Sequence, residues 1–159
     1  MGKINVCYWF IRFVENLPNL KFDVYRDIST SIHAIFKRYS DLVEGVALNE
    51  AYLDVTENKQ NITYASTIAR HIKTAIFQET QLMATAGVSI NKFLAKMASG
   101  QNKPNGLTVI LSEDAIAFVE QLAIEKFHGI GEVTAAKMYS LGIHTGADLK
   151  ERSLQIAGC

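Results

Sequence analysis

The chain has 159 residues, enough for one domain or two small units, and its apolar share of 48% is ordinary for a globular protein. Its 16 basic and 16 acidic residues cancel, which excludes a protein coated in positive charge for nucleic-acid binding. The apolar run Val6–Val14 is too short to span a bilayer, and Cys7 and Cys159 lack disulfide or metal spacing, so we expect a reducing, cytosolic setting.

The first third of the chain predicts a strand, a helix and a hairpin. Aromatic and branched residues over Lys3–Val14 are typical of a buried strand. Apolar residues at helical spacing favour a helix over Phe22–Arg38. Two β-type segments follow, Leu42–Leu48 and Ala51–Val55. Because only two residues separate them, we expect an antiparallel hairpin.

The middle of the chain alternates helical and strand patterns. Apolar spacing over Ile62–Ile76 predicts an amphipathic helix, and Met83–Val88 is typical of a strand. A short helix is expected over Asn91–Ser99. The turn Lys103–Gly106 then precedes a further strand, Leu107–Leu111.

Beyond about residue 110 the pattern is purely helical. Ser112 is predicted to cap a helix whose first turn holds Glu113 and Asp114, where the helix dipole favours acidic residues. Mixed strands and helices followed by helices alone indicate an α+β fold with a helical appendage.

Charge is distributed unevenly along the middle of the chain. No acidic residue lies between Glu79 and Glu113, whereas Lys92, Lys96 and Lys103 fall inside that interval. Chance spacing in a buried strand-helix-strand unit would give this pattern, and so would a phosphate-facing surface. Charge alone leaves both interpretations open.

Three blocks of sequence carry a family resemblance. They are Leu48–Thr56, Gly87–Ser99 with the turn Lys103–Gly106, and Gly129–Gly131 followed by Leu141–Ile143. In this order and spacing they resemble the palm and the start of the thumb of Y-family (DinB/UmuC-type, DNA polymerase IV-like) translesion DNA polymerases.

The resemblance implies a domain organisation. Residues 1–110 would form a palm with a mixed or antiparallel sheet and packed helices, and residues 111–159 a partial all-helical thumb with a helix-hairpin-helix. The family's fingers segment is expected to be absent after about residue 15, and its little-finger domain is expected to be absent as well.

The family's catalytic carboxylates have changed here. Family members hold two Mg²⁺ ions with two aspartates and a glutamate, and the resemblance places Asn5, Asn49 and Glu50 at these positions. A neutral amide is a poor Mg²⁺ ligand, so Glu50 alone would hold one weak, largely hydrated ion at best. We expect a site without working two-metal catalysis, whose ancestry would be supported if the three residues converge at the head of one sheet.

The resemblance also assigns nucleotide contacts. Lys103 would contact the phosphates of a deoxynucleotide triphosphate as a flexible point charge, and Phe10 would pack against its sugar. A solvated turn lysine and a core aromatic residue are the open alternatives.

A helix-hairpin-helix would provide the DNA contacts. Glycines such as Gly129 and Gly131 let backbone amides at a helix N-terminus face a DNA phosphate, and Lys137 would add a contact. Such binding is expected to be weak, non-specific and salt-sensitive.

Three functions therefore stay in view. The first is a polymerase-derived core that no longer polymerises. The second is a weakly active minimal DNA polymerase, and the third is a non-catalytic DNA-binding module built on the helix-hairpin-helix. We rank the minimal polymerase last, because it would need metals at a site with one carboxylate.

Overall fold

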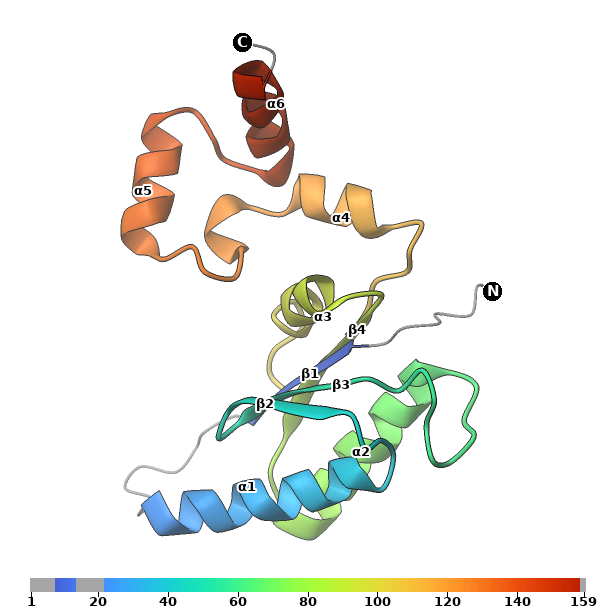
Figure 1. Cartoon of the computed structure of the whole chain (residues 1–159). Coiled ribbons are helices and arrows are strands. Elements are labelled where there is room, and N and C mark those ends of the chain that lie inside the picture. The colour runs from blue at the N-terminus through green and yellow to red at the C-terminus, as the bar shows by residue number, and fades with distance from the viewer. Residues whose placement is uncertain (1–7, 14–21, 158–159) are drawn as a thin grey trace. The chain divides into compact units, whose positions relative to one another are not determined.

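The computed structural model describes the backbone of residues 8–13 and 22–157 and the side chains of residues 23–153. The chain divides into two compact units, residues 1–112 and residues 113–159. The first unit contains the sheet and three helices, and the second contains the remaining helices (Figure 1).

The first unit is built on a five-stranded mixed sheet. Its strands are β1 (Tyr8–Phe13), β2 (Val43–Ala47), β3 (Glu50–Leu53), β4 (Ala84–Ser89) and β5 (Leu107–Val109). Their order across the sheet is β2-β3-β1-β4-β5. All neighbours are antiparallel except β4 and β5, which run parallel.

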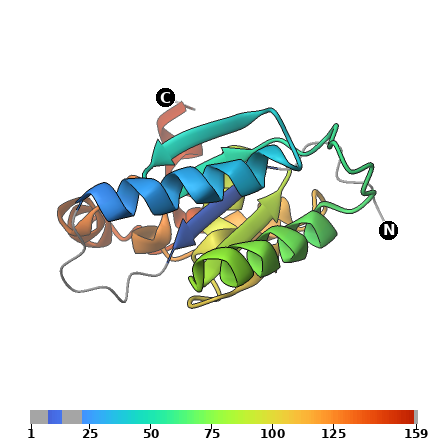
Figure 2. The ribbon, with the colours of Figure 1, turned by 90° about the horizontal axis from the view of Figure 1, so that it is seen from below.

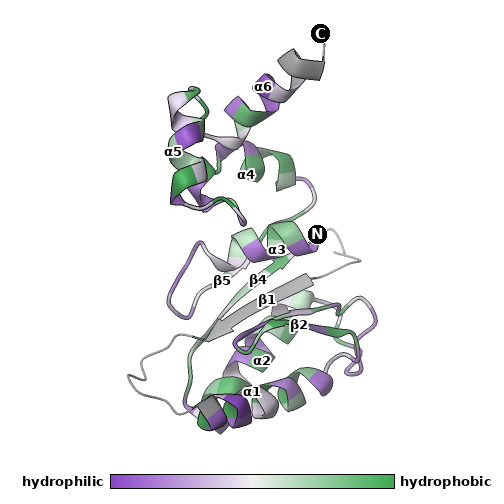
Figure 3. Cartoon of the chain, turned by 60° about the vertical axis from the view of Figure 1, so that its left-hand side comes forward, coloured by the Kyte–Doolittle hydropathy of each residue, from purple (hydrophilic) through white to green (hydrophobic). Residues whose placement is uncertain are grey.

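Helices cover both faces of this sheet. The helices α1 (Phe22–Lys37) and α2 (Ala65–Thr80) lie side by side across one face (Figure 2), and α3 (Lys92–Ser99) lies over the other. Hydrophilic and hydrophobic residues alternate along α1 and α2 (Figure 3), as expected of helices with one buried stripe. The stripe forms the core with inward strand residues: Ile32, Ile35, Phe36, Leu53, Ile68, Ile72, Ile76 and Val88.

The period of two along the strands decides which side chains face α3. Ala51 and Leu53 of β3 belong to the core beneath α1 and α2, so the alternate residues Glu50 and Tyr52 point to the opposite face. On β4 that face carries Gly87, where a Cβ atom would lie 2.0 Å from the carbonyl oxygen of Ala95 in α3. The absence of a side chain at Gly87 therefore lets α3 lie directly on the sheet.

The second unit is helical throughout. It contains α4 (Ala115–Gln121), a 3-10 turn η1 (Ile124–Lys126), α5 (Glu132–Ser140) and α6 (Gly146–Ala157). Its small core consists of buried and partly buried apolar side chains from these elements and their connections: Ile124, Phe127, Ile130, Ala135, Met138, Ile143 and Leu149.

The predicted α+β organisation is confirmed, with shifts at several element ends. The hairpin turn is formed by Leu48 and Asn49, because Glu50 already belongs to β3. The predicted helix over Ile62–Ile76 runs from Ala65 to Thr80, and the last strand ends at Val109 rather than Leu111.

The predicted cap at Ser112 was wrong. Residues 112–114 form a turn, so Glu113 and Asp114 precede α4 and no acidic residue lies in its first helical turn. Asp114 occupies the cap position with helical backbone angles and no capping hydrogen bond from its side chain. In the described part of the chain, no helix is both long and apolar enough to cross a membrane.

Candidate functional site

The turn between β2 and β3 brings two predicted site residues together. Leu48, Asn49 and Glu50, which we call the hairpin head, are all half-buried. The backbone of Glu50 pairs with Arg12 near the C-terminal end of β1. Asn5, the third predicted carboxylate position, lies outside the described residues.

Glu50 forms an ion pair with the helix that covers its face of the sheet. Lys96 of α3 places its Nζ atom 2.8 Å from Oε2 of Glu50. The side chains are only 12% exposed for Lys96 and 17% exposed for Glu50. Because a mostly buried charge is costly without a partner, the ion pair offsets part of the cost of burying these two groups.

A second, more exposed pair lies beside the first. Lys92, one helical turn before Lys96, contacts the carboxylate of Glu44 on β2 and lies 5.6 Å from the ring centre of Tyr52. Burial raises the pKa of the Tyr52 hydroxyl, and the negative charge of Glu50 raises it further. Lys92 and Lys96 therefore direct their charges at strand carboxylates, and their role as a phosphate-facing surface stays a prediction.

The two residues predicted to contact a nucleotide lie apart, one in a central strand and one in a turn at the edge of the sheet. Phe10 lies in β1, where its backbone pairs with Gly87. Lys103 lies in the exposed turn that leads into β5 at one edge of the sheet. Across the base of that turn the side-chain amide of Asn102 donates to the hydroxyl of Thr108 in β5, at 2.8 Å.

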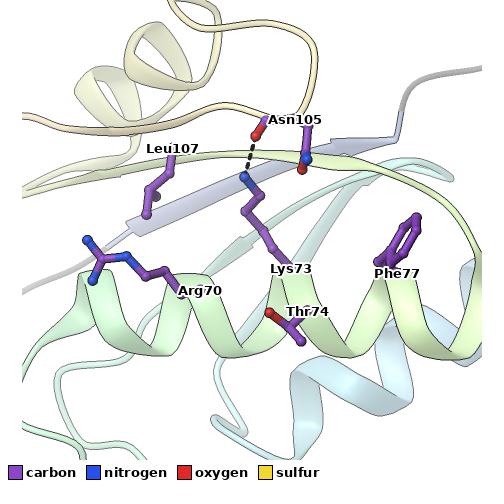
Figure 4. Close-up of a pocket in the computed structure, with 6 residues that line it drawn as sticks. All are labelled: Arg70, Lys73, Thr74, Phe77, Asn105 and Leu107. Carbon is purple, nitrogen blue, oxygen red and sulfur yellow. Dashed lines mark hydrogen bonds between the residues drawn. The ribbon is translucent and has the colours of Figure 1, made fainter.

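A groove of about 530 Å³ opens between α2 and the Lys103 turn. Arg70, Lys73, Thr74 and Phe77 line it from α2, with Asn105 and Leu107 opposite (Figure 4). Lys73 reaches across the groove, and its Nζ atom donates to the carbonyl oxygens of Asn105 at 2.5 Å and Gly106 at 2.9 Å. Burial lowers the pKa of the Lys73 ammonium group.

The segment Gly129–Gly131, which we call the glycine turn, leads into α5 in the second unit. Gly129 has a φ of +92°, a region that L side chains rarely adopt, and a Cβ atom there would meet nothing within 4 Å. Gly131 is the N-cap of α5 and has no side chain to satisfy the first amide groups of the helix. Ile130 packs against the small core, and Lys137 is exposed on α5.

Hydrogen bonds between Asp148 and the two residues before Gly146 fix the start of α6. The Asp148 carboxylate accepts hydrogen bonds from the backbone amides of His144 and Thr145, both at 2.9 Å. In return the Thr145 hydroxyl accepts from the Asp148 amide, at 3.3 Å. This reciprocal arrangement is a capping box at the start of α6, and it lowers the pKa of Asp148.

Sequence reasoning missed the partners of three basic or capping residues. The ion pair between Lys96 and Glu50 joins residues far apart in the chain, and no local pattern marks it. Lys73 lies on α2 beside Ile72 and three residues before Ile76, which are both buried. Helical spacing alone therefore indicated that Lys73 would be half-buried. The Thr-x-x-Asp spacing of Thr145 and Asp148 was likewise available.

Solved structures of DinB-family and Y-family DNA polymerases resemble this fold. DinB from Sulfolobus solfataricus has a TM-score of 0.73 and 35% sequence identity, over 79% of this chain and 37% of that chain. An insertion ternary complex of Dbh DNA polymerase has a TM-score of 0.72 and 35% identity, with the same coverage. The first unit, with its sheet, three helices and hairpin head, therefore has the architecture of a Y-family polymerase core.

The chain belongs to the impB/mucB/samB family, which matches residues 14–100. The helix-hairpin-helix motif of the IMS family matches residues 112–143. Over 134 residues, 84% of the chain, it is 54% identical to DNA polymerase IV of Leptospira interrogans and 59% identical to DNA polymerase IV 3 of Mesorhizobium japonicum. The aligned part is 37% of the length of each relative.

Proposed function

We propose that this chain is a palm and partial thumb of a translesion DNA polymerase that has lost nucleotidyl transfer. Its relatives are DNA polymerases IV, and the helix-hairpin-helix match suits contact with DNA. The observation that carries the loss is Asn49 at the hairpin head, beside a Glu50 carboxylate that is already paired with Lys96.

The donor set at the hairpin head does not fit two magnesium ions. A pair of divalent cations requires several anionic oxygens, because the ions repel one another and Mg²⁺ prefers carboxylates. Here Asn49 contributes a neutral amide, and the Glu50 carboxylate already forms an ion pair with the Lys96 ammonium group, 2.8 Å away. Among the described residues no group of three His, Cys, Asp or Glu side chains is arranged to hold a metal ion. Asn5, if it aligns with the third position, would add a second neutral amide.

The connection between β1 and α1 supports the same proposal. Only eight residues, 14–21, separate the end of β1 from the start of α1. Eight residues are too few to form a domain with a core of its own. A fingers segment between these two elements, which would cover a nucleotide, therefore has no room in this sequence.

Primer extension tests the proposed loss of activity. We expect no incorporation on a primer–template with either Mg²⁺ or Mn²⁺, while DNA polymerase IV of Leptospira interrogans, run in parallel, extends the primer. Incorporation of even one nucleotide by this chain would overturn the proposal and favour the minimal polymerase.

A second candidate function is non-catalytic DNA binding through the glycine turn. It is favoured by the amide groups at the start of α5, which have no side-chain cap from Gly131. Amides at a helix N-terminus attract phosphate without reading sequence. Glu132 in the first turn of α5 opposes an anion, so the affinity is expected to be low and to fall with salt.

Gly131→Val is the sharper test of that second function. Gly131 has an extended backbone with open space around it, so a side chain there blocks the amides without straining the turn. We expect weaker duplex binding at low salt, measured by fluorescence anisotropy. Unchanged binding would make the glycine turn structural only.

A further inference from the structure

We infer that Lys73 is a positioning residue that holds the Lys103 turn in place from across the groove. This inference rests on the proposed function, in which Lys103 contacts nucleotide phosphates. Lys73 itself belongs to α2 and lies 30 positions earlier in the chain, so nothing in the local sequence of the turn reveals the connection.

The hydrogen bonds of Lys73 join α2 to the Lys103 turn, which is itself bonded to β4. Its Nζ atom donates to the carbonyl oxygens of Asn105 and Gly106, consecutive residues at the end of the turn. The Gly106 carbonyl also accepts a hydrogen bond from the Ala86 amide of β4, at 3.0 Å. One ammonium group thus ties α2 to the turn at the point where the turn meets the sheet (Figure 4).

The turn needs such support because its backbone is constrained. Asn105 has a φ of +57°, a left-handed conformation that costs a non-glycine residue about 1 kcal/mol or more. A Cβ atom at Gly106 would lie 1.8 Å from the carbonyl oxygen of Asn102, so the chain passes very close to itself. A conformation of this kind persists when surrounding contacts determine it.

The partners of Lys73 indicate a role in positioning. Within the described part of the chain, both hydrogen bonds of the Lys73 ammonium group go to backbone carbonyls of the turn, so its charge holds those two peptide groups. In Figure 4 its side chain lies between Arg70 and Phe77 and points away from α2 to Asn105. Arg70, one turn earlier, lines the same groove but makes no hydrogen bond to the turn among the described residues.

Arg70 supplies a matched control for the experiment. Lys73→Met and Arg70→Met each remove one positive charge from the same groove and the same face of α2, but only the first removes bonds to the turn. Inorganic tripolyphosphate serves as the phosphate probe, titrated into each labelled full chain and followed by amide NMR shifts. Hydrogen exchange of the Ala86 amide reports the turn independently of any ligand.

We expect Lys73→Met to weaken tripolyphosphate binding at least threefold and to speed Ala86 exchange, whereas Arg70→Met changes affinity much less. In a Lys103→Met background, Lys73→Met should cause no further loss, because it acts through Lys103. Lys73→Arg, which keeps donors at this position, should retain most of the affinity.

The outcomes separate the inference from the function on which it rests. Unchanged affinity in Lys73→Met, together with reduced affinity in Lys103→Met, would overturn the positioning role. Equal losses in Lys73→Met and Arg70→Met would reduce Lys73 to a general electrostatic effect and also overturn it. If Lys103→Met itself has no effect, the phosphate role of Lys103 fails, and Ala86 exchange still decides whether Lys73 holds the turn.

Discussion

The hairpin head and the glycine turn differ in which atoms carry the chemistry. At the hairpin head the proposed loss of nucleotidyl transfer rests on side chains, because an amide at Asn49 would replace a carboxylate while the fold of the hairpin persists. At the glycine turn the useful groups are backbone amides, which any sequence supplies if it can adopt the turn. On this proposal a site made of side chains can be lost by a single isosteric exchange, whereas a site made of backbone is lost when its conformation is lost.

The two regions also differ in how their charges are balanced. Around the hairpin head, lysines of α3 pair with carboxylates of the strands, at Lys96 with Glu50 and at Lys92 with Glu44. These pairs attach α3 to the sheet whether or not a metal is present. At the start of α5 the only charged residue of the first turn is the acidic Glu132, which would weaken the phosphate contact proposed there.

Restoring the carboxylates should give the largest effect. Asn5→Asp with Asn49→Asp should raise Mn²⁺ affinity at least about tenfold in calorimetry, because carboxylates are the ligands that such ions prefer. Gln78→Glu with Gln121→Glu adds the same charge at exposed positions and should leave the affinity almost unchanged. Equal affinities in the two double variants would mean that the hairpin head is not the ancestral metal site.

The register of β1 sharpens that experiment. Arg12 is the residue of β1 whose backbone pairs with Glu50. Tyr8, at the start of β1, lies four residues earlier, roughly 13 Å along an extended strand. The described end of β1 that is nearer to Asn5 in the sequence therefore lies away from Glu50, and the contribution of Asn5 has to be measured separately. Comparing Asn49→Asp alone with the double variant isolates the contribution of Asn5. If the two bind Mn²⁺ equally, the first metal-ligand position is not Asn5.

Breaking the more buried ion pair should cost more than breaking the exposed one. Lys96→Met leaves the Glu50 carboxylate mostly buried and unsatisfied on that side, and we expect a loss of about 2 kcal/mol in the free energy of unfolding. Lys92→Met, where the two side chains are 42% and 59% exposed, should cost less than about 1 kcal/mol. Chemical denaturation measures both, and equal losses would contradict the difference in burial.

The glycine turn should separate conformational cost from phosphate contact. Gly129→Ala places a side chain at a φ of +92° and should destabilise the second unit by about 1 kcal/mol. Gly131→Ala, with an extended backbone, should leave stability unchanged. Hydrogen exchange at amides of residues 113–157 in the full chain reports both, and equal destabilisation would show that the turn does not need its left-handed residue.

The capping box should make α6 sensitive to acid. Hydrogen bonds from His144 and Thr145 lower the pKa of Asp148 below its ordinary value of 3.8. A lowered folded-state pKa contributes stability above the ordinary value, and this stability is lost as the pH falls through the folded-state pKa. Exchange protection of α6 should therefore decrease as the pH falls below about 4, and Asp148→Asn should remove this dependence.

Local sequence patterns predicted most of the fold. Apolar periodicity predicted α1, α2 and α3. The short separation between two β-type segments at Asn49 predicted the hairpin, because both signals depend on neighbouring residues. The cap of α4 was missed because Ser112 and Asp114 are both favoured N-cap residues, so local preference does not select between them. Element ends shifted for the same reason.

The candidate site was predictable only as far as motifs reach. The motif around Asn49 and Glu50 marked the hairpin head, but the partner of Glu50 depends on α3 crossing above Gly87, a long-range contact. The bonds from Lys73 to the Lys103 turn also join distant segments. Such pairs follow from the packing of whole elements, which single-sequence patterns do not encode.

Paramagnetic Mn²⁺ tests the central claim most directly. Titrated into the labelled native chain, Mn²⁺ broadens the amide signals of residues near its binding site. With an amide at Asn49 and a paired Glu50, we predict no selective broadening at the hairpin head when Mn²⁺ is equimolar with protein. Stoichiometric broadening centred on Asn49 and Glu50, saturating at two ions per chain, would contradict the account.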